Sequence, residues 1–485
     1  MTSLSETSML AGAAGQSTGF TIGQSIRFNK ADSAYISRTV SSAGNQRTFT
    51  ISWWWKFGLL GSLSGAAHQL WNSYADNNNR FSIMIDNDVG SGAAGDKLCI
   101  FNNASGTTQE ILETNRLFRD PSAWYHFVVT VDTTQATKFE RVRLYVNGER
   151  ESNYAESSMP AQNYQMNWNA ANLHLFGKYG GGTSNNADGY MAECNHIDGT
   201  ALGPENFGEF KEDTNIWIPK KYTGSYGTNG FRITGETNND LGKNVASGNT
   251  FATYASTNLA TNDQRADTPT NNQITFNPLN NQQSGGTLTN GNLEYTGPST
   301  RTNISLTANI PATGKWAVAF KATDNSNDEW NMGITKATNT NFGDAAGSNE
   351  AIGGQDNDGI QFLPSSNDAS LYNYIGSAAI DPSLPITTSD EFWMAVDMGT
   401  GKCFLGIYDA SATAMKFVAA DAGIDGNPAT GDNPTITISD MIGSLDYAFA
   451  VNSKSTNVWT LLRSTEVSGT TPTGYTYFEN VKDLL

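Results

Sequence analysis

The chain has 485 residues, of which 47 are Asp or Glu and 29 are Lys or Arg, so that its net charge is −18 and only 16% of its residues are charged. Its many Asn, Ser, Thr and Gly residues exclude a helical bundle or coiled coil, because these residues favour turns over helices. An aromatic content of 11% argues against disorder, and the negative charge argues against nucleic acid and anionic membrane surfaces as partners.

Cysteine usage and hydropathy narrow the class of protein further. Cys99, Cys194 and Cys403 are widely spaced and form neither a disulfide framework nor a CxxC pair. The first residues lack the basic and apolar regions of a signal peptide, and no stretch reaches the length of about 18 apolar residues that a transmembrane helix needs. We therefore expect a non-secretory protein, and length favours two or three domains of about 100–200 residues each.

Small and polar residues over 1–24 predict an N-terminal arm, which either frays or becomes ordered on docking to another protein. Strand patterns follow it. Residues 48–57 carry apolar side chains at alternate positions, which predicts one buried face, while Trp54 falls on the other face and needs a covering segment or subunit. The same texture predicts strands at 80–86, 96–102, 124–132, 141–146, 173–176 and 189–197.

Turn and helix signals complete the first half of the chain. Asn147 and Gly148 predict a hairpin turn after the strand at 141–146, since both residue types tolerate positive φ. Residues 204–210 predict a short helix with a proline in its first turn.

Residues 235–292 differ in texture from the rest of the chain. Asn, Thr, Ser and Gly dominate and aromatics nearly vanish, so this segment cannot fold by itself. We expect either a linker or an extended connection that lies over its neighbours. Strand patterns return beyond it, at 315–322, 330–335, 359–363, 392–397, 402–408, 447–451 and 458–462.

The first half of the chain resembles a known family. Its concanavalin A-like (laminin-G-type) jelly-roll domain occurs in structural proteins of tailed bacteriophages, and the most specific stretch is 217–231 (WIPKKYTGSYGTNGF). Further similarity lies at 25–29, 34–39, 43–50, 124–127, 144–149, 189–193 and 267–272. The second half resembles more weakly the SPRY-like sandwich that often follows, at 314–316, 397–402 and 472–475.

These observations together predict an all-β chain of two antiparallel β-sandwich domains, both jelly-roll and concanavalin A-like in type. The expected organisation is an arm over 1–24, a concanavalin A-like sandwich over 25–234, an extended linker over 235–292 and a SPRY-like sandwich over 293–485. The resemblance implies a virion component, most often a tail-fibre or host-recognition protein.

Catalytic motifs are missing from the sequence. Glycosidases of this fold carry a strand-borne E-x-D-x-x-E set of acids, and the nearest text here, from Glu151 to Glu156, has Asn153 in place of the middle acid. His68, His126, His174 and His196 are scattered without ligand spacing, and the two within strands are expected to be ordinary sheet residues. We therefore predict a protein that is not an enzyme.

Two loop clusters combine aromatic rings with amide or carboxylate groups, the mixture typical of sites for polar ligands such as glycans. One contains Trp71, Tyr74 and Asn77; the other contains Tyr179, Asn185 and Asp188. The alternative for both is that the aromatics close an edge of the sandwich, since large aromatic side chains dominate core burial.

Calcium is the one cofactor that the sequence suggests. Laminin-G-type folds often bind this ion through loop oxygens, and Asp356 and Asp358 lie in an oxygen-rich loop. The alternative is that these residues are turn formers.

Two functions remain open at this stage. The first is a tail-fibre or appendage protein on the virion exterior that binds host-surface polysaccharide, and the second is a purely architectural capsid-decoration, head-fibre or tail-associated protein. A depolymerase lacks its acids. Expected partners are other virion proteins and copies of the same chain, as a homotrimer by family analogy, without nucleic acid or membrane.

Overall fold

A computed structural model gives the architecture of the chain. It divides into two compact units, Met1–Gln273 and Ile274–Leu485. No helix among the described residues is long and apolar enough to cross a membrane. The residues that the structure describes are 19–60, 67–86, 95–212, 214–248, 251, 253–281, 286–298, 302–323, 331–337, 352, 359–364, 369–373, 378–380, 386–421, 423–453 and 457–484.

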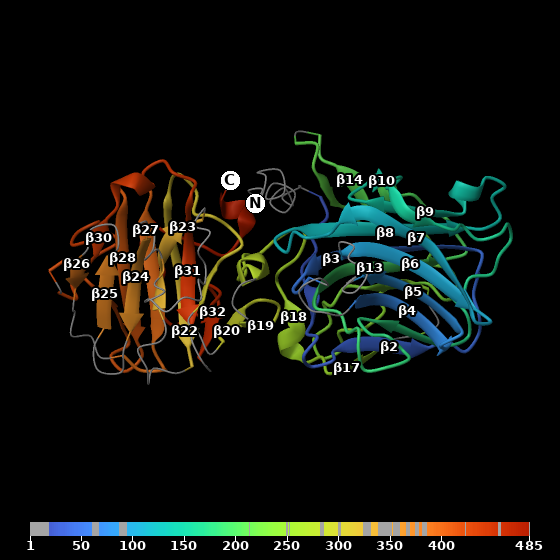
Figure 1. The fold of residues 1–485 in the computed structure, drawn as a ribbon, viewed down its shortest axis with the longest axis horizontal. Coiled ribbons are helices and arrows are strands. Elements are labelled where there is room, and N and C mark those ends of the chain that lie inside the picture. Colours follow the sequence, from blue (N-terminus) through green and yellow to red (C-terminus); the bar gives the residue numbers. More distant parts are fainter. Residues whose placement is uncertain are drawn as a thin grey trace. The chain divides into compact units, whose positions relative to one another are not determined.

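The first unit contains two large antiparallel sheets, which we call the β3 sheet and the β4 sheet (Figure 1). The β3 sheet has the order β10 (Glu149–Arg150), β9 (Val142–Val146), β8 (Trp124–Asp132), β3 (Thr48–Phe57), β13 (Gly189–Asp198), β1 (Ser25–Phe28) and β18 (Gln264–Arg265), with β16 (Phe231–Ile233) also paired to β13. The β4 sheet has the order β11 (Tyr154–Ser157), β7 (Thr107–Leu117), β6 (Lys97–Ala104), β5 (Asn79–Ile85), β4 (His68–Asp76), β12 (Leu173–Phe176), β2 (Tyr35–Thr39) and β17 (Ala255–Thr257).

Alternation along β3 places its large apolar side chains between the two sheets. Trp53 and Trp55 are fully buried there, and the Trp53 ring lies 5.7 Å from that of Trp71 on β4. Trp54 points to the outer face of the β3 sheet, as its position in the alternation predicts. That face is covered by residues of the same unit, among them Ile22 and Trp217. The all-β fold of packed antiparallel sheets predicted from the sequence is thereby confirmed for the first unit.

The predicted hairpin turn at Asn147 and Gly148 is present, and the predicted helix at 204–210 is present only in part. Asn147 and Gly148 join β9 to β10 with φ angles of 49° and 83°, the left-handed pair that a tight hairpin needs. The helix expected over 204–210 is shorter. It consists of a single 3₁₀ turn, η2 (Pro204–Asn206). The chain then continues as β14 (Gly208–Phe210), which pairs with β15 (Trp217–Pro219).

The structure draws the division between the units at residue 273, inside the segment expected to be a linker. Residues up to 273 pack within the first unit, where β17 pairs with β2, β18 pairs with β1, and Tyr254 is buried. Residues from Ile274 onward belong to the second unit, where Ile274 and Phe276 are fully buried. The two sandwiches are therefore consecutive, and the polar segment is shared between them.

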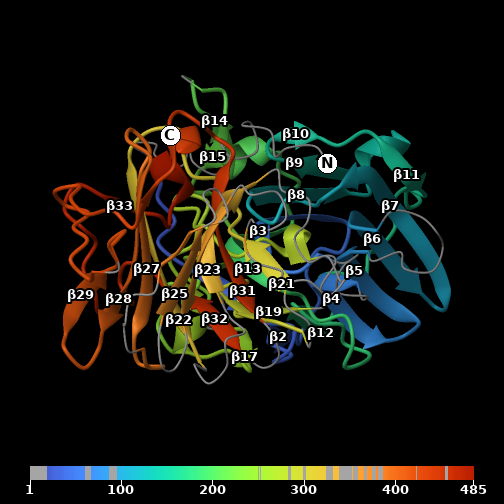
Figure 2. The same ribbon diagram turned by 60° about the vertical axis from the view of Figure 1, so that its left-hand side comes forward.

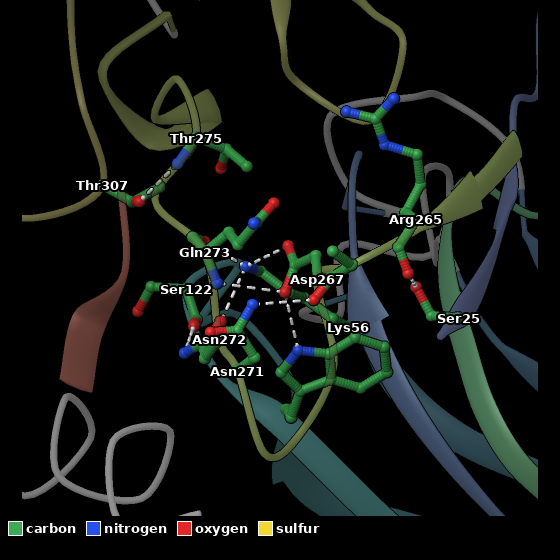
Figure 3. Close-up of polar contacts among 12 residues, drawn as sticks. Ser25, Lys56, Ser122, Arg265, Asp267, Asn271, Asn272, Gln273, Thr275 and Thr307 are labelled. Carbon is green, nitrogen blue, oxygen red and sulfur yellow. Dashed lines mark hydrogen bonds and ion pairs between the residues drawn. The ribbon is translucent and has the colours of Figure 1, made fainter. Parts of the chain in front are cut away.

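Buried polar contacts hold the last part of this segment on the outer face of the β3 sheet (Figure 3). The Lys56 ammonium on β3 donates to Asp267 Oδ2 and to Asn272 Oδ1, each at 2.8 Å, and to the Gln273 carbonyl. Asp267 Oδ1 also accepts from Trp124 Nε1 at 3.0 Å. We call these five residues the Lys56–Asp267 network. Because each charge is paired and hydrogen-bonded, burial of this polar segment is tolerated.

The second unit also contains two large sheets (Figure 2). The larger contains β19 (Thr287–Thr289), β20 (Glu294–Thr296), β32 (Val458–Leu461), β22 (Lys315–Ala322), β27 (Glu391–Asp397), β28 (Lys402–Asp409) and β29 (Ala414–Phe417), with β30 (Ile436–Thr437) on β28 and β33 (Thr476–Tyr477) parallel to β22. The smaller contains β21 (Thr302–Ser305), β31 (Tyr447–Ser453), β23 (Asn331–Lys336), β24 (Gly359–Pro364), β25 (Ala369–Asn373) and β26 (Ala378–Ile380).

Short 3₁₀ turns are the only helical elements among the described residues. Besides η2 they are η1 (Lys138–Glu140), η3 (Thr261–Asp263), η4 (Pro278–Asn281), η5 (Ser439–Met441) and η6 (Val481–Leu484).

Candidate functional site

Tyr74 and Asn77 of one predicted cluster meet Tyr179 of the other on the outer face of the β4 sheet. Tyr74 lies on β4, and Tyr179 lies beyond the end of β12, which is hydrogen-bonded to β4. Their ring centroids are 5.6 Å apart and the ring planes meet at 77°. Both side chains are half-buried. Two aromatic rings 105 positions apart in the sequence thus form a corner that is open to solvent.

Asn77 ties the two tyrosines together. It is exposed in the turn between β4 and β5, and its Oδ1 accepts from Tyr74 Oη at 3.2 Å and from Tyr179 Oη at 2.7 Å. Among the described residues, no protein group accepts a hydrogen bond from its Nδ2 amide. That amide is available as a donor.

The glycine run after Tyr179 allows its loop to lie directly on the sheet. The Gly180 amide donates to Asn72 Oδ1 at 2.8 Å, and a Cβ at Gly180 would come within 2.6 Å of the Tyr74 ring. A Cβ at Gly181 would come within 2.8 Å of Tyr74 Oη and 2.9 Å of Asn77 Oδ1. Any side chain at either position would therefore push the two tyrosines away from Asn77.

Arg80 belongs to this site, although the sequence analysis did not single it out. It lies directly opposite Tyr74 in the β4–β5 pair, so both side chains project from the same face. Its Nη1 donates to Tyr179 Oη, and its guanidinium carbon lies 5.1 Å from the Phe101 ring centroid and 5.2 Å from that of Tyr179. A hairpin turn at 77–78 was the signal that could have revealed this pairing. We call Tyr74, Asn77, Arg80 and Tyr179 the Tyr74–Tyr179 cluster.

Trp71 does not join the cluster, which corrects the expectation that it binds a ligand. The structure shows a strand at 68–76 where we expected a loop, and strand alternation turns Trp71 inward while Tyr74 turns outward. Only 2% of Trp71 is exposed, and its ring packs against those of Trp168 and Phe176 in the core. Here the alternative of a structural aromatic holds.

Asp188 and Asn185 also lie away from the cluster. Asp188 is buried, and its carboxylate accepts the amides of Lys30 and Leu59, each at 3.1 Å, so that it ties three chain segments together. Burial raises the pKa of Asp188 to about 6, against the opposing effect of these amides. The Asn185 carbonyl accepts from the Gln69 amide at 3.1 Å, at the start of β4 and not at the Asn77 turn.

The calcium expectation falls on residues that the structure does not describe. Asp356 and Asp358 both lie outside the described ranges. Within those ranges, no group of three or more His, Cys, Asp or Glu side chains is placed to hold a metal ion.

All four histidines lie in the interior of the first unit. Desolvation lowers the pKa of His68, His126 and His174 to about 3 and that of His196 to about 4, so they are neutral at pH 7. His126, for example, stacks on Trp54 at 4.7 Å and accepts from Trp217 Nε1 at 2.9 Å. These are core residues with structural partners.

Glu151, the acid nearest to a glycosidase pattern in the sequence, has a structural role in its surroundings. One of its oxygens accepts the amides of Ser152 and Asn153, and the other pairs with Arg116 Nε at 3.1 Å. It lines a depression of about 350 Å³ together with Phe139, Arg150, Ser152 and Tyr154. The side chain of Glu156 is outside the described set.

Residues 29–205 match the family model described as the concanavalin A-like lectin/glucanases superfamily, of laminin G type. The matched residues lie within the first unit and include every member of the Tyr74–Tyr179 cluster. No curated protein matches the sequence.

Solved structures similar to this chain include domains LG4-5 of the mouse laminin alpha1 chain, with 7% identity, 90% of this chain and 84% of that chain covered, and a TM-score of 0.28. The SPRY domain of human HERC1 has 12% identity, coverages of 38% and 96%, and a TM-score of 0.26. Tailspike protein 2 of an Escherichia coli O157:H7 bacteriophage has 14% identity, coverages of 38% and 24%, and a TM-score of 0.28. At this level of similarity none of the three bears on function.

Proposed function

We propose that this chain is a non-enzymatic, carbohydrate-binding structural protein of a bacteriophage virion, a tail-fibre or appendage protein whose first unit engages host-surface glycan. The Tyr74–Tyr179 cluster is the observation that carries the proposal. Two half-buried tyrosines at a solvent-open corner supply ring faces for a pyranose, and the Asn77 amide and the Arg80 guanidinium supply donors for its hydroxyls.

Two further observations support the proposal. The family model that matches residues 29–205 describes lectins and glucanases, and the chain lacks the E-x-D-x-x-E acids of the glucanases. The virion assignment rests on the sequence resemblance of 217–231 and the other stretches to structural proteins of tailed bacteriophages.

A glycan array probed with the full chain tests the binding function. We expect retention of a subset of oligosaccharides and a loss of affinity of about tenfold or more for Tyr179→Ala, because an aromatic anchor carries a large share of binding energy. Phe139→Ala is the matched control, since Phe139 is an aromatic of the same unit that is 49% exposed and lies outside the cluster. Retention of no oligosaccharide would reject carbohydrate binding.

Competition with phage adsorption tests the virion role. Saturating protein should block adsorption to host cells, and Tyr179→Ala should block it less. Calcium remains part of the proposal: loss of competition in chelator would support an ion at Asp356 and Asp358, and indifference to chelator would remove both from the site. Glycan binding without competition would overturn receptor recognition alone.

One observation favours the architectural alternative. Ile442 and Leu445, in the segment that follows η5 in the second unit, are 51% and 53% exposed, and exposed aliphatic side chains of this size suit contact with another virion protein or another copy of the chain. A stable homotrimer in solution that dissociates in Leu445→Ser, together with a silent glycan array, would favour this function.

A further inference from the structure

Arg80 differs in its surroundings from six of the other ten arginines of the first unit. Six of them, namely Arg27, Arg116, Arg119, Arg143, Arg150 and Arg232, form ion pairs with a carboxylate. Arg80 is half-buried, yet no carboxylate pairs with it among the described residues. Burial of a guanidinium without a counter-ion is costly.

Ring contacts hold this guanidinium in place without neutralising it. It lies between the rings of Phe101 and Tyr179, and one nitrogen, Nη1, donates to Tyr179 Oη. Its Nε is buried without an acceptor, and no described protein group accepts from Nη2. The planar fork is therefore oriented by the protein while part of its donor capacity is unused.

Two donors of the cluster, besides the buried Nε of Arg80, have no acceptor within the described protein. The Asn77 oxygen is taken by two hydroxyl groups, and the nearby Asp76 carboxylate accepts from the Asn78 amide and from Asn79 Nδ2. Within the cluster, the donors besides this Nε that no described protein group accepts from are the Asn77 amide and Nη2 of Arg80. One of these two donors is cationic.

We propose that the Tyr74–Tyr179 cluster selects acidic glycans, and that Arg80 binds the anionic group of one sugar, a carboxylate or a sulfate. This inference rests on the proposed glycan-binding function and specifies its substrate class. A carboxylate matches the fork of a guanidinium, because it can accept two parallel hydrogen bonds. A neutral sugar carries no group that pairs with Arg80 in this way. In a chain of strongly negative net charge, a cation without a carboxylate partner at the site favours an anionic ligand.

The test uses the full chain on an array in which every uronate- or sialate-containing oligosaccharide is printed beside its carboxyl-reduced form, and every sulfated one beside its desulfated form. We expect the acidic member of a pair to bind about 10- to 100-fold more tightly, the ratio that a charge-assisted hydrogen bond supplies. Arg80→Gln should abolish this ratio, and Arg80→Lys should restore part of it. Arg150→Gln removes one positive charge elsewhere on the same unit, where side-chain exposure is 40%, and should change nothing.

Each outcome separates this inference from the function on which it rests. Equal binding of acidic and neutral partners, unchanged in Arg80→Gln, overturns the inference and leaves glycan binding intact. Binding of no member of any pair overturns the proposed function itself. If Arg80→Gln unfolds at a lower urea concentration than the parent chain, the ratio of acidic to neutral binding in Arg80→Lys decides, because that ratio is independent of the folded fraction.

Discussion

The outer faces of the two sheets in the first unit are built from the same kinds of residue, but one face is covered by the chain and the other is exposed to solvent. The face of the β3 sheet carries the Lys56–Asp267 network, in which the lysine and aspartate side chains are at most 2% exposed and the aspartate accepts from both Lys56 and Trp124. The face of the β4 sheet carries the Tyr74–Tyr179 cluster, which is open to solvent and keeps unused donors.

This contrast shows what separates a structural polar cluster from a binding site. Both regions contain an aromatic ring, an asparagine and a cation. On the β3 sheet, residues 267–273 of the same chain supply every acceptor that Lys56 needs. On the β4 sheet, no described segment supplies a carboxylate for Arg80. Spare hydrogen-bonding capacity at an exposed ring, and not residue type, identifies the second region as the candidate site.

The largest expected effect is acid destabilisation, which acts on buried groups and should leave binding at the exposed cluster unchanged. The folded pKa values of the four histidines, about 3 to 4, lie below the unfolded value of 6.5, so the unfolded state binds more protons and stability falls as pH drops below 6.5. Each histidine costs about 1.4 kcal/mol per pH unit in this range. Asp188 acts in the opposite direction, because its raised pKa of about 6 favours the folded state as pH falls toward 3.8, and offsets about one histidine.

Urea unfolding at pH 7.0, 6.0 and 5.0 measures this dependence. Glycan affinity over the same range should stay nearly constant while the chain remains folded, since hydrogen bonds from Asn78 and Asn79 lower the pKa of Asp76 and keep it charged. His126→Gln should reduce the slope of stability against pH by one proton. A slope that is unchanged in this variant would show that His126 is not buried in its neutral form.

The next effect in size concerns the buried network. Asp267→Ala should lower the free energy of unfolding of the first unit by about 3–5 kcal/mol, because it leaves the Lys56 ammonium buried without its counter-ion. The matched control is Glu209→Ala, which removes an ion pair with Lys220 whose two side chains are about half exposed, and should cost less than about 1 kcal/mol. Equal losses in the two variants would remove the distinction between the two kinds of polar contact.

The smallest effect tests the geometry of the exposed face. Gly181→Ala should weaken glycan binding several-fold with a change in stability of about 1 kcal/mol or less, since its Cβ meets the Tyr179 ring edge, the Tyr74 hydroxyl and the Asn77 side-chain oxygen at a solvent-open site. Gly182→Ala is the control, because its nearest neighbours lie 3.9 Å away, an ordinary contact distance. Affinity measured by calorimetry against the tightest array glycan should be normal in Gly182→Ala and reduced in Gly181→Ala. The reverse order would place the ligand elsewhere.

Much of the fold could be predicted because its signal is local. The strands at 48–57, 124–132, 173–176 and 315–322 have the predicted bounds, since alternating apolar residues specify a half-buried strand wherever it pairs. The strand at 68–76 was missed, since polar residues interrupt its pattern. That omission misplaced Trp71, because a side chain can be assigned to a face only once the strand and its alternation are known.

For the polar segment 235–292 the sequence left a linker and an extended connection over its neighbours as alternatives, and it could not decide between them for a related reason. Burial was judged from apolar residues alone, and this segment is buried largely through paired polar groups. Asp263 pairs with Arg27 at 2.9 Å, and Asp267 with Lys56 at 2.8 Å. Ion-pair partners more than 200 positions away cannot be inferred from the local sequence pattern.

The sequence by itself determined the all-β class, part of the strands of both sandwiches and the candidate residues Tyr74 and Tyr179, because period-two burial and turn chemistry act between neighbouring residues. Only the tertiary structure decided which side chains share a surface. The hydrogen-bonded register of β4 with β5 and β12 sends Trp71 into the core and brings Tyr74, Arg80 and Tyr179 together outside it. Long-range strand pairing fixes that register, and no local pattern specifies it.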